Sequence, residues 1–199
     1  RLALDGVLDV ACGPGTVVAA FAPHVAQAIG IDATEAMLAE ARALGTRVGL
    51  ANVEWRAGSA YALPWPDATF ELVVSRFAFH HLEDPRAAFA EMRRVAAPGA
   101  RIVLCDGVAD DDPAKATAFN EMERWRDPST VEFRTGGYLA GLFAAHGLDC
   151  ALTARFQVPY LARDFVAAAH PRDDDRAGLL RLIEDAVDGD RMGLNARWT

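Results

Sequence analysis

Residues 7–22, VLDVACGPGTVVAAFA, contain a short apolar run, a glycine-rich turn and a second apolar run. The pattern predicts a strand over Val7–Val10, a turn at Gly13-Pro14-Gly15 and a helix that starts at Thr16. Glycines in such a turn leave backbone N–H groups accessible and let a ligand approach closely. The stretch therefore predicts a strand–turn–helix site for a nucleotide-like ligand, and several unrelated cofactors use such a site.

The rest of the first half of the chain alternates strand and helix patterns. Further strands are predicted at Ala26–Ile31, Val53–Ala57, Phe70–Val74 and Ile102–Cys105, and helices at Thr16–Ala22, Thr34–Ala43 and Arg86–Ala96. Thr34 and Asp84 are the expected N-caps of the last two helices, and Pro98-Gly99 is expected to end the last one. Such alternation predicts βαβ units, and hence a Rossmann-like α/β fold with a mostly parallel central sheet flanked by helices.

After Cys105 the pattern changes, with an acidic break at 110–113. Helices are predicted through Phe119–Trp125 and at Gly136–Ala145, Leu161–Ala169 and Arg176–Val187, and a strand at Leu148–Pro159. We expect one domain over 1–199. Its parts would be a cofactor-binding core (1–106), a helical lid inserted after the fifth strand (107–135) and a C-terminal helix and strand part (136–199).

Composition excludes several classes of function. The 199 residues carry a formal net charge of −8, whereas a nucleic-acid partner requires a basic face. No apolar run approaches the roughly 20 residues that span a bilayer. The three cysteines lack CxxC spacing, which favours reduced thiols in the cytoplasm over a disulfide framework or a zinc site. Monomer and homodimer both remain open.

Asp9 and Asp32 narrow the choice of ligand. Asp32 ends the second predicted strand, where a carboxylate can accept hydrogen bonds from ribose hydroxyls. Asp9 would repel the pyrophosphate of a dinucleotide, and Val18 stands where the third glycine of the dinucleotide fingerprint would fall. A ligand with an ammonium and a sulfonium, such as S-adenosylmethionine, would be attracted instead. The alternative role for Asp9 is to cap the turn through backbone N–H groups.

The chain resembles a known family over residues 5–106. VLDVACGPG, GIDATEAMLAEAR, NVEWRAGSAYALPWPDATFELVVSRFAFHHLEDP and EMRRVAAPGARIVLCD are similar to successive motifs of class I S-adenosylmethionine-dependent methyltransferases, in particular the ubiquinone and menaquinone biosynthesis type. RDPSTVEFRTGGYLAGLFAAHGL continues the resemblance more loosely. The resemblance implies S-adenosyl-L-methionine as the cofactor and a small-molecule methyl acceptor.

The resemblance also implies residue roles. The methionine part of the cofactor would lie among Asp9, Ala11, Gly13 and Gly15, and near Ser75, Arg76 and Phe77. Asp32 would bind the ribose, and the adenine would contact Ala33, Met37, Ser59, Ala60 and Tyr61. Two positions depart from the family pattern, because Ser59 replaces an acid and Glu71 replaces an aspartate. The family sheet usually ends in an antiparallel hairpin, so its last strand is either outside these 199 residues or elsewhere in the chain.

Candidates for chemistry should follow the fourth and fifth strands, since open α/β sheets bind ligands at their carboxyl edge. His80 is the candidate general base, and His80, His81 and Asp106 are candidate acceptor contacts. The alternative is a structural role, in which one imidazole hydrogen-bonds to the backbone of the turn. Two adjacent histidines could also bind a metal, but no third residue has the spacing of a metal ligand. Trp125 and Arg126 are further acceptor candidates in the expected lid, although Arg126 could instead pair with Glu123 or Asp127.

The sequence thus predicts methyl transfer to a small molecule, with C-methylation of a quinone-like ring as one option. One alternative is a non-catalytic S-adenosylmethionine-binding regulatory or scaffold protein. The other is a nicotinamide-dependent oxidoreductase, which the negative charge of Asp9 disfavours.

Overall fold

A computed structural model describes residues 4–197 of the chain. The chain divides into two compact units, Arg1–Asp106 and Gly107–Thr199. Within the described residues, no helix has both the length and the apolar character needed to cross a membrane. The predicted roles of 107–135 as a lid and 136–199 as a C-terminal part stay predictions.

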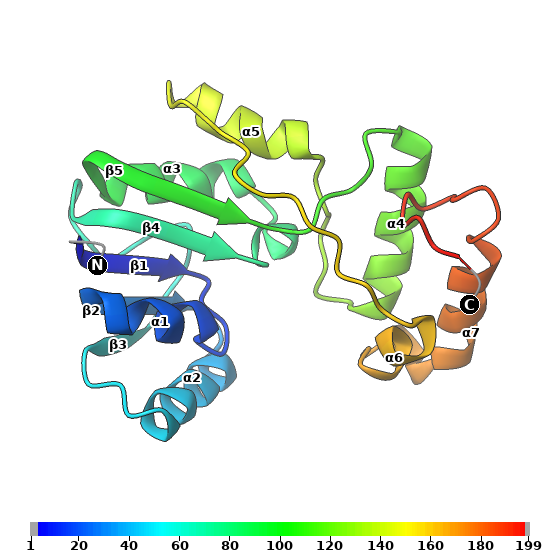
Figure 1. Cartoon of the computed structure of the whole chain (residues 1–199), viewed down its shortest axis with the longest axis horizontal. Helices are drawn as coiled ribbons and strands as arrows, with labels where there is room; N and C mark the ends of the chain where they lie inside the picture. Colours follow the sequence, from blue (N-terminus) through cyan, green and yellow to red (C-terminus); the bar gives the residue numbers. More distant parts are fainter. Residues whose placement is uncertain (1–3, 198–199) are drawn as a thin grey trace. The chain divides into compact units, whose positions relative to one another are not determined.

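The first unit is built on a five-stranded parallel sheet (Figure 1). The strands are β1 (Leu4–Val10), β2 (Val25–Asp32), β3 (Val53–Ala57), β4 (Phe70–Arg76) and β5 (Ala96–Cys105), in the order β3-β2-β1-β4-β5. All four strand pairs are parallel. This confirms the α/β fold and the mostly parallel sheet that the alternating pattern predicts.

Three helices flank this sheet: α1 (Thr16–Phe21), α2 (Glu35–Arg47) and α3 (Pro85–Val95). α1 and α2 connect β1 to β2 and β2 to β3, whereas α3 connects β4 to β5 in the opposite direction along the sheet. Right-handed crossovers in opposite directions place helices on opposite faces, and Figure 1 shows α1 and α2 in front of the strands and α3 behind them.

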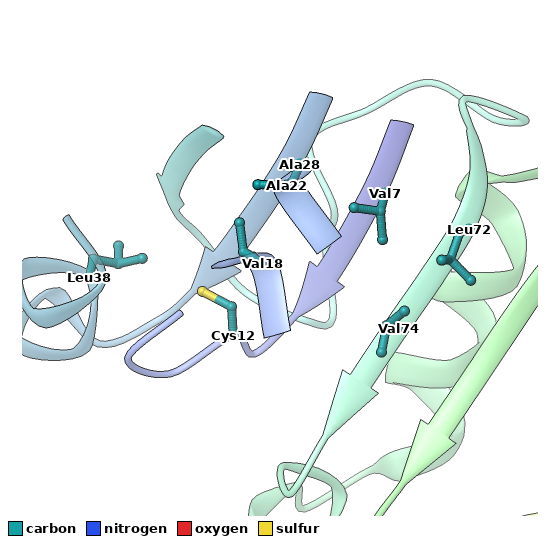
Figure 2. Packing of buried hydrophobic residues seen from close by; sticks show 8 residues of the cluster. All are labelled: Val7, Cys12, Val18, Ala22, Ala28, Leu38, Leu72 and Val74. Carbon is teal, nitrogen blue, oxygen red and sulfur yellow. The ribbon is translucent and has the colours of Figure 1, made fainter. Parts of the chain in front are cut away.

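A compact apolar cluster joins the strands to α1 and α2 (Figure 2). Its buried members are Val7, Cys12, Val18, Ala22, Ala28, Leu38, Leu72 and Val74. They come from β1, β2, β4, α1, α2, the turn after β1 and the 3₁₀ helix Ala22–His24. Burial of this apolar surface holds the glycine-rich turn against the sheet.

The boundaries of α3 follow from local chemistry. Oδ1 of Asp84 accepts hydrogen bonds from the backbone N–H groups of Arg86 and Ala87, and Pro85 is the first helical residue, which confirms the predicted cap. The predicted range Arg86–Ala96 lies within one residue of the observed helix at each end, but the prediction that Pro98-Gly99 ends the helix was wrong. α3 ends at Val95, and β5 begins at once and contains the Pro-Gly pair. An edge strand tolerates proline, and the pairing of β4 with β5 shifts register beside it.

The second unit contains α4 (Pro113–Arg126), α5 (Gly136–Ala145), α6 (Ala162–Ala167) and α7 (Arg176–Asp185). A second apolar cluster includes Met122 of α4, Val166 of α6, and Leu179 and Ile183 of α7. Each of the four predicted helical segments therefore contains a helix, and α4 begins earlier than expected because Asp112 caps it.

The predicted strand at Leu148–Pro159 was wrong. Apolar side chains recur there at every second position, yet the segment makes no strand pairing among the described residues, and its Leu152, Phe156 and Val158 are exposed. A period of two predicts a strand only where a neighbouring strand accepts its hydrogen bonds. The end of the chain, where the family resemblance placed the approach to a last strand, includes 198–199, which lie outside the described residues.

Candidate functional site

The order of the strands places a topological switch point in the first unit, and we call the carboxyl edge of the sheet at this point the β1–β4 crevice. The chain leaves β1 toward β2 on one side, whereas β4 is followed by β5 on the other, so the direction changes between β1 and β4. Ligands of open α/β sheets bind at the carboxyl ends of the strands that flank such a switch point. The residues there are the turn Ala11–Gly15 after β1 and the segment Ser75–Phe77 at the end of β4.

The turn after β1 is held in an unusual backbone conformation. Gly13 and Gly15 have positive φ angles of 51° and 79°, and Ala11 has a φ of 56°, which is uncommon for a residue with a side chain. A Cβ on Gly15 would lie 2.4 Å from an indole carbon of Trp55. Gly15 is therefore required both by its conformation and by the indole packed against it.

Asp9 lies in β1 just before this turn and is 1% exposed. Neither of its carboxylate oxygens has a hydrogen-bond partner within residues 4–197. Burial, and secondarily the negative charge of Asp32, raise the pKa of Asp9 to about 8, while Arg76 acts in the opposite direction. The alternative that Asp9 caps the turn was therefore wrong. A buried, unpartnered carboxyl group costs stability and indicates a missing partner.

Asp32, and not Asp9, caps the turn after β1. Its Oδ2 accepts a hydrogen bond from the backbone N–H of Gly13 and its Oδ1 accepts one from Thr34, both at 2.8 Å. Thr34 is the N-cap residue of α2, as predicted, although its side chain makes no cap hydrogen bond. Each carboxylate oxygen retains a second lone pair, so Asp32 can bind the turn and a ligand hydroxyl together.

The remaining predicted cofactor residues occupy the same edge or the loop after β3. Ser75 is buried, and its hydroxyl donates to the carbonyl of Val10 at 2.8 Å, which ties β4 to β1. The Oγ of Ser59 accepts from the backbone N–H of Tyr61 at 3.1 Å, and the Tyr61 hydroxyl accepts from that of Asp84. Ala33 is exposed, whereas Met37 and Ala60 are half-buried. The contacts of these residues with a cofactor stay predictions.

Arg76 and Phe77 end β4 at the crevice. Phe77 has a φ of 52° and an exposed ring, and the guanidinium of Arg76 lies 4.3 Å from the centroid of that ring. The backbone N–H of Phe77 donates to the carbonyl of Cys105 at 2.8 Å. Strained residues with exposed aromatic rings are characteristic of binding sites, and the sequence gives no local signal for this strain.

His80 and Asp106 meet at the ends of β4 and β5. Nδ1 of His80 lies 2.6 Å from Oδ1 of Asp106, and the backbone N–H of His80 donates to Oδ2 at 3.1 Å. The ring of His81 lies 4.0 Å from that of His80, centroid to centroid. All three residues were predictable candidates from the sequence, but the contact between Asp106 and His80 was not.

Trp125 and Arg126 lie in the second unit. Nε of Arg126 donates to Oε2 of the buried Glu123 at 2.7 Å, and its guanidinium lies over the ring of Phe165, as in the pairing alternative. Trp125 lines a cavity of about 440 Å³ together with Glu121, Arg124, Asp173 and Asp175. These contacts give Arg126 a structural role, and contact of either residue with an acceptor stays a prediction.

The described residues show neither a reactive thiol at Cys12 nor a metal site. Burial and the nearby Asp9 raise the pKa of the Cys12 thiol above its usual range, so the thiol stays neutral and unreactive. In the described part of the chain, no group of three or more histidine, cysteine or acidic residues has the arrangement of a metal site.

Comparison with known proteins agrees with this geometry. Residues 8–104 match the family model described as a methyltransferase domain. The structure of YcgJ from Bacillus subtilis superposes with a TM-score of 0.87 at 30% identity, covering 94% of this chain and 82% of that one. A methyltransferase from Bacillus halodurans, described as putative, superposes with a TM-score of 0.84 at 28% identity, covering 90% and 77% of the two chains.

The chain therefore belongs to the family of Rossmann-like class I methyltransferases. A demethylmenaquinone methyltransferase from Thermus thermophilus is 32% identical over 165 residues, which are 82% of this chain and 72% of that protein. YcgJ, known as an uncharacterized methyltransferase, is 37% identical over 142 residues, 71% of this chain and 56% of its own length. The chain thus spans only about half of that curated relative.

Proposed function

We propose that this protein binds S-adenosyl-L-methionine at the β1–β4 crevice and transfers its methyl group to a small molecule. The observation that carries the proposal is the unpartnered carboxyl group of Asp9. The cofactor has an ammonium and a sulfonium, either of which supplies the positive charge that a buried carboxylate lacks. A pyrophosphate would bring negative charge to the same place, which argues against a nicotinamide cofactor.

The residues around the crevice would contact different parts of the cofactor. Asp9 and the turn through Gly13 and Gly15 would receive the methionine part, and Asp32 would accept hydrogen bonds from the ribose. Ala33, Met37 and 59–61 would surround the adenine, and Ser75, Arg76 and Phe77 would border the methionine end. Because Ser59 is uncharged where relatives usually have an acid, adenine binding would rely more on packing and backbone groups.

The bound cofactor supplies an electrophilic methyl group on sulfur. The protein's own task is then to align an acceptor with that group and to exclude water. The similarity to demethylmenaquinone methyltransferase supports a quinone-like ring as the acceptor, with methylation at carbon. The scaffold serves many acceptors, so this choice is the narrower part of the proposal. The cytoplasm as location stays a prediction from the cysteine content.

Calorimetry tests the cofactor. The full chain should bind S-adenosylmethionine and S-adenosylhomocysteine and should not bind NADH. Asp9→Asn should weaken binding of the first two by about 10-fold or more at pH 8.5, as expected for one lost charged interaction. Binding of NADH without a response to the other two ligands would refute the proposal.

A second experiment separates an enzyme from a non-catalytic scaffold. The chain and methyl-labelled S-adenosylmethionine are incubated with a metabolite extract, and labelled small molecules are identified by mass spectrometry. A labelled quinone-type product supports the narrower proposal, and a labelled product of another class supports transfer alone. Tight cofactor binding with no labelled product would favour the scaffold.

A further inference from the structure

The loop that joins β3 to β4, residues 58–69, contains neither helix nor strand. Backbone hydrogen bonds hold its two ends. The N–H of Gly58 donates to the carbonyl of Asp32 at 3.0 Å, and the N–H of Ala68 donates to the carbonyl of Arg94 at 2.9 Å. Because a loop has no repeating hydrogen-bond pattern of its own, its conformation between these ends depends on other parts of the first unit.

Two side chains of α3 supply those contacts. Nη2 of Arg94 donates to the carbonyl of Leu63 and Nη1 donates to the carbonyl of Trp65, both at 2.8 Å. Oε2 of Glu91 accepts from the backbone N–H of Leu63, also at 2.8 Å. The side chain of Leu63 is buried. Leu63 is therefore held at its N–H, its carbonyl and its side chain, and α3 provides the first two of these contacts.

Glu91 and Arg94 also bind each other. Nε and Nη2 of Arg94 donate to Oε1 and Oε2 of Glu91, both at 2.7 Å, which is the bidentate geometry that fixes a guanidinium against a carboxylate. The hydrogen bond from Arg94 lowers the pKa of Glu91, so the carboxylate is ionised at neutral pH. Nη1 also contacts Asp67 at 3.0 Å, but that side chain is 79% exposed and contributes little. The guanidinium is thus fixed on both the helix side and the loop side.

A further contact between α3 and the loop involves Tyr61, which the proposed function places at the adenine. The N–H of Asp84, the N-cap residue of α3, donates to the hydroxyl of Tyr61 at 3.3 Å. Asp84, Glu91 and Arg94 recur at the spacing of one helix face. One face of α3 therefore holds the loop at several points, and the position of the loop follows the position of the helix.

Recognition of adenine would depend on this positioning. The edge of an adenine offers an amino group that donates and a ring nitrogen that accepts. Ser59 carries no charge, and its Oγ already accepts from the backbone N–H of Tyr61 at 3.1 Å. In the proposed function, backbone groups of 59–61 would therefore contribute much of the recognition. Hydrogen bonds distinguish one ligand from another only where the protein groups are held in place.

We propose that the Glu91–Arg94 pair determines how well the protein distinguishes adenine from other bases, by fixing the backbone of 59–61. Both are positioning residues, because they act through the loop. This inference rests on the proposed function and deepens it, since it assigns the base selectivity of the cofactor site to a face of α3. Without the pair, the loop would still pack against a base, but its donors and acceptors would not be held in one arrangement.

Calorimetry with two ligands that differ only in the base tests the proposal. S-adenosylhomocysteine carries adenine. S-inosylhomocysteine carries hypoxanthine, in which a carbonyl replaces the amino group and the neighbouring ring nitrogen carries a proton. The full wild-type chain should bind the adenine ligand at least about 10-fold more tightly. In Arg94→Gln, this ratio of dissociation constants should fall at least about threefold, because a glutamine cannot bind Glu91 and both loop carbonyls together.

Two further variants sharpen the comparison. Arg93→Gln is the matched control, because it makes the same substitution at the neighbouring position of α3, where the guanidinium donates to the carbonyl of Ala96. It should keep the wild-type ratio. Glu91→Gln is the milder change, since its amide oxygen can still accept from Leu63 while its pairing with Arg94 weakens. Its ratio should lie between those of the wild type and Arg94→Gln, and it serves as the test if Arg94→Gln does not fold.

The outcomes separate the two proposals. A wild-type chain that binds neither ligand overturns the proposed function. A wild-type chain that binds both ligands equally well has no base selectivity and overturns the role of the pair alone. Variants of the pair that lose the same factor in affinity for both ligands also overturn it, because an unchanged ratio shows a purely structural role. An equal fall of the ratio in Arg93→Gln overturns it as well.

Discussion

The charge state of Asp9 should control how tightly the protein binds S-adenosylmethionine. The pKa of Asp9 is raised to about 8, mainly by burial and then by Asp32, so the side chain is mostly neutral at pH 7. The charged groups that act on it are Asp32 and Arg76. The neighbouring Cys12 stays a neutral thiol, because its pKa is raised above the usual range. Binding of a cationic ligand therefore requires Asp9 to lose a proton.

The size of the effect follows from the fraction of ionised Asp9. With a pKa of about 8, that fraction rises from about 3% at pH 6.5 to about 76% at pH 8.5. When only the ionised form binds well, the apparent affinity scales with this fraction. The affinity should therefore increase about 25-fold over these two pH units, and binding at pH 7 should release close to one proton.

Calorimetry of the wild type and Asp9→Asn across this pH range measures the effect. The amino group of the ligand also titrates between about pH 7 and 8, but it does so for both proteins. The ratio of the two dissociation constants therefore isolates Asp9. That ratio should rise about 25-fold with pH. A ratio that stays constant, or an Asp9→Asn variant that binds as tightly as the wild type at pH 8.5, would refute the reasoning.

Three further predictions concern stability. Asp9→Asn should raise the free energy of unfolding of the unliganded protein at pH 7 by at most about 4 kcal/mol. Because the pKa of Asp9 is higher in the folded than in the unfolded protein, the penalty that Asn removes grows as the pH rises from about 4 to 8. Chemical denaturation at pH 4 should therefore show no gain in stability. Gly15→Ala should destabilise the first unit by about 2 kcal/mol or more and weaken cofactor binding, since its methyl group meets Trp55; unchanged thermal unfolding would contradict this. Asn120→Ala should cost about 1–3 kcal/mol in urea unfolding, because the buried N–H and C=O of Phe133 lose their partner, whereas wild-type stability would show that water replaces the amide.

Local patterns predicted most of the first unit. Apolar runs, Asp84-Pro85 and the glycine turn each act over a few residues, so the strands and helices could be placed from sequence with errors only at their ends. The bounds of α3 were predicted to within one residue, but Pro98-Gly99 was wrongly expected to end the helix, because the pair lies in the edge strand β5. The strand predicted at Leu148–Pro159 was wrong for a related reason. Alternating apolar residues are typical of a strand, but they do not show whether a neighbouring strand is present to pair with it.

The candidate site was likewise only partly predictable from the sequence. The chemistry of Asp9 and Asp32 was predictable from residue type and spacing, but their division of labour was not. Asp32 takes the backbone N–H of Gly13 from 19 residues away, which leaves Asp9 without a partner. Trp55 beneath Gly15 was missed altogether, because an indole in a predicted strand looks like ordinary core.

The sequence by itself determined the alternation of strands and helices, the glycine-rich turn and the negative charge before it, because these depend on neighbours along the chain. Only the tertiary structure decided that Asp9 is buried without a partner and that His80 is held by Asp106, 26 residues further on. Desolvation and pairing of charges depend on which strands become adjacent. Parallel strands bring their carboxyl ends to one edge, but side-chain packing decides which group there meets which.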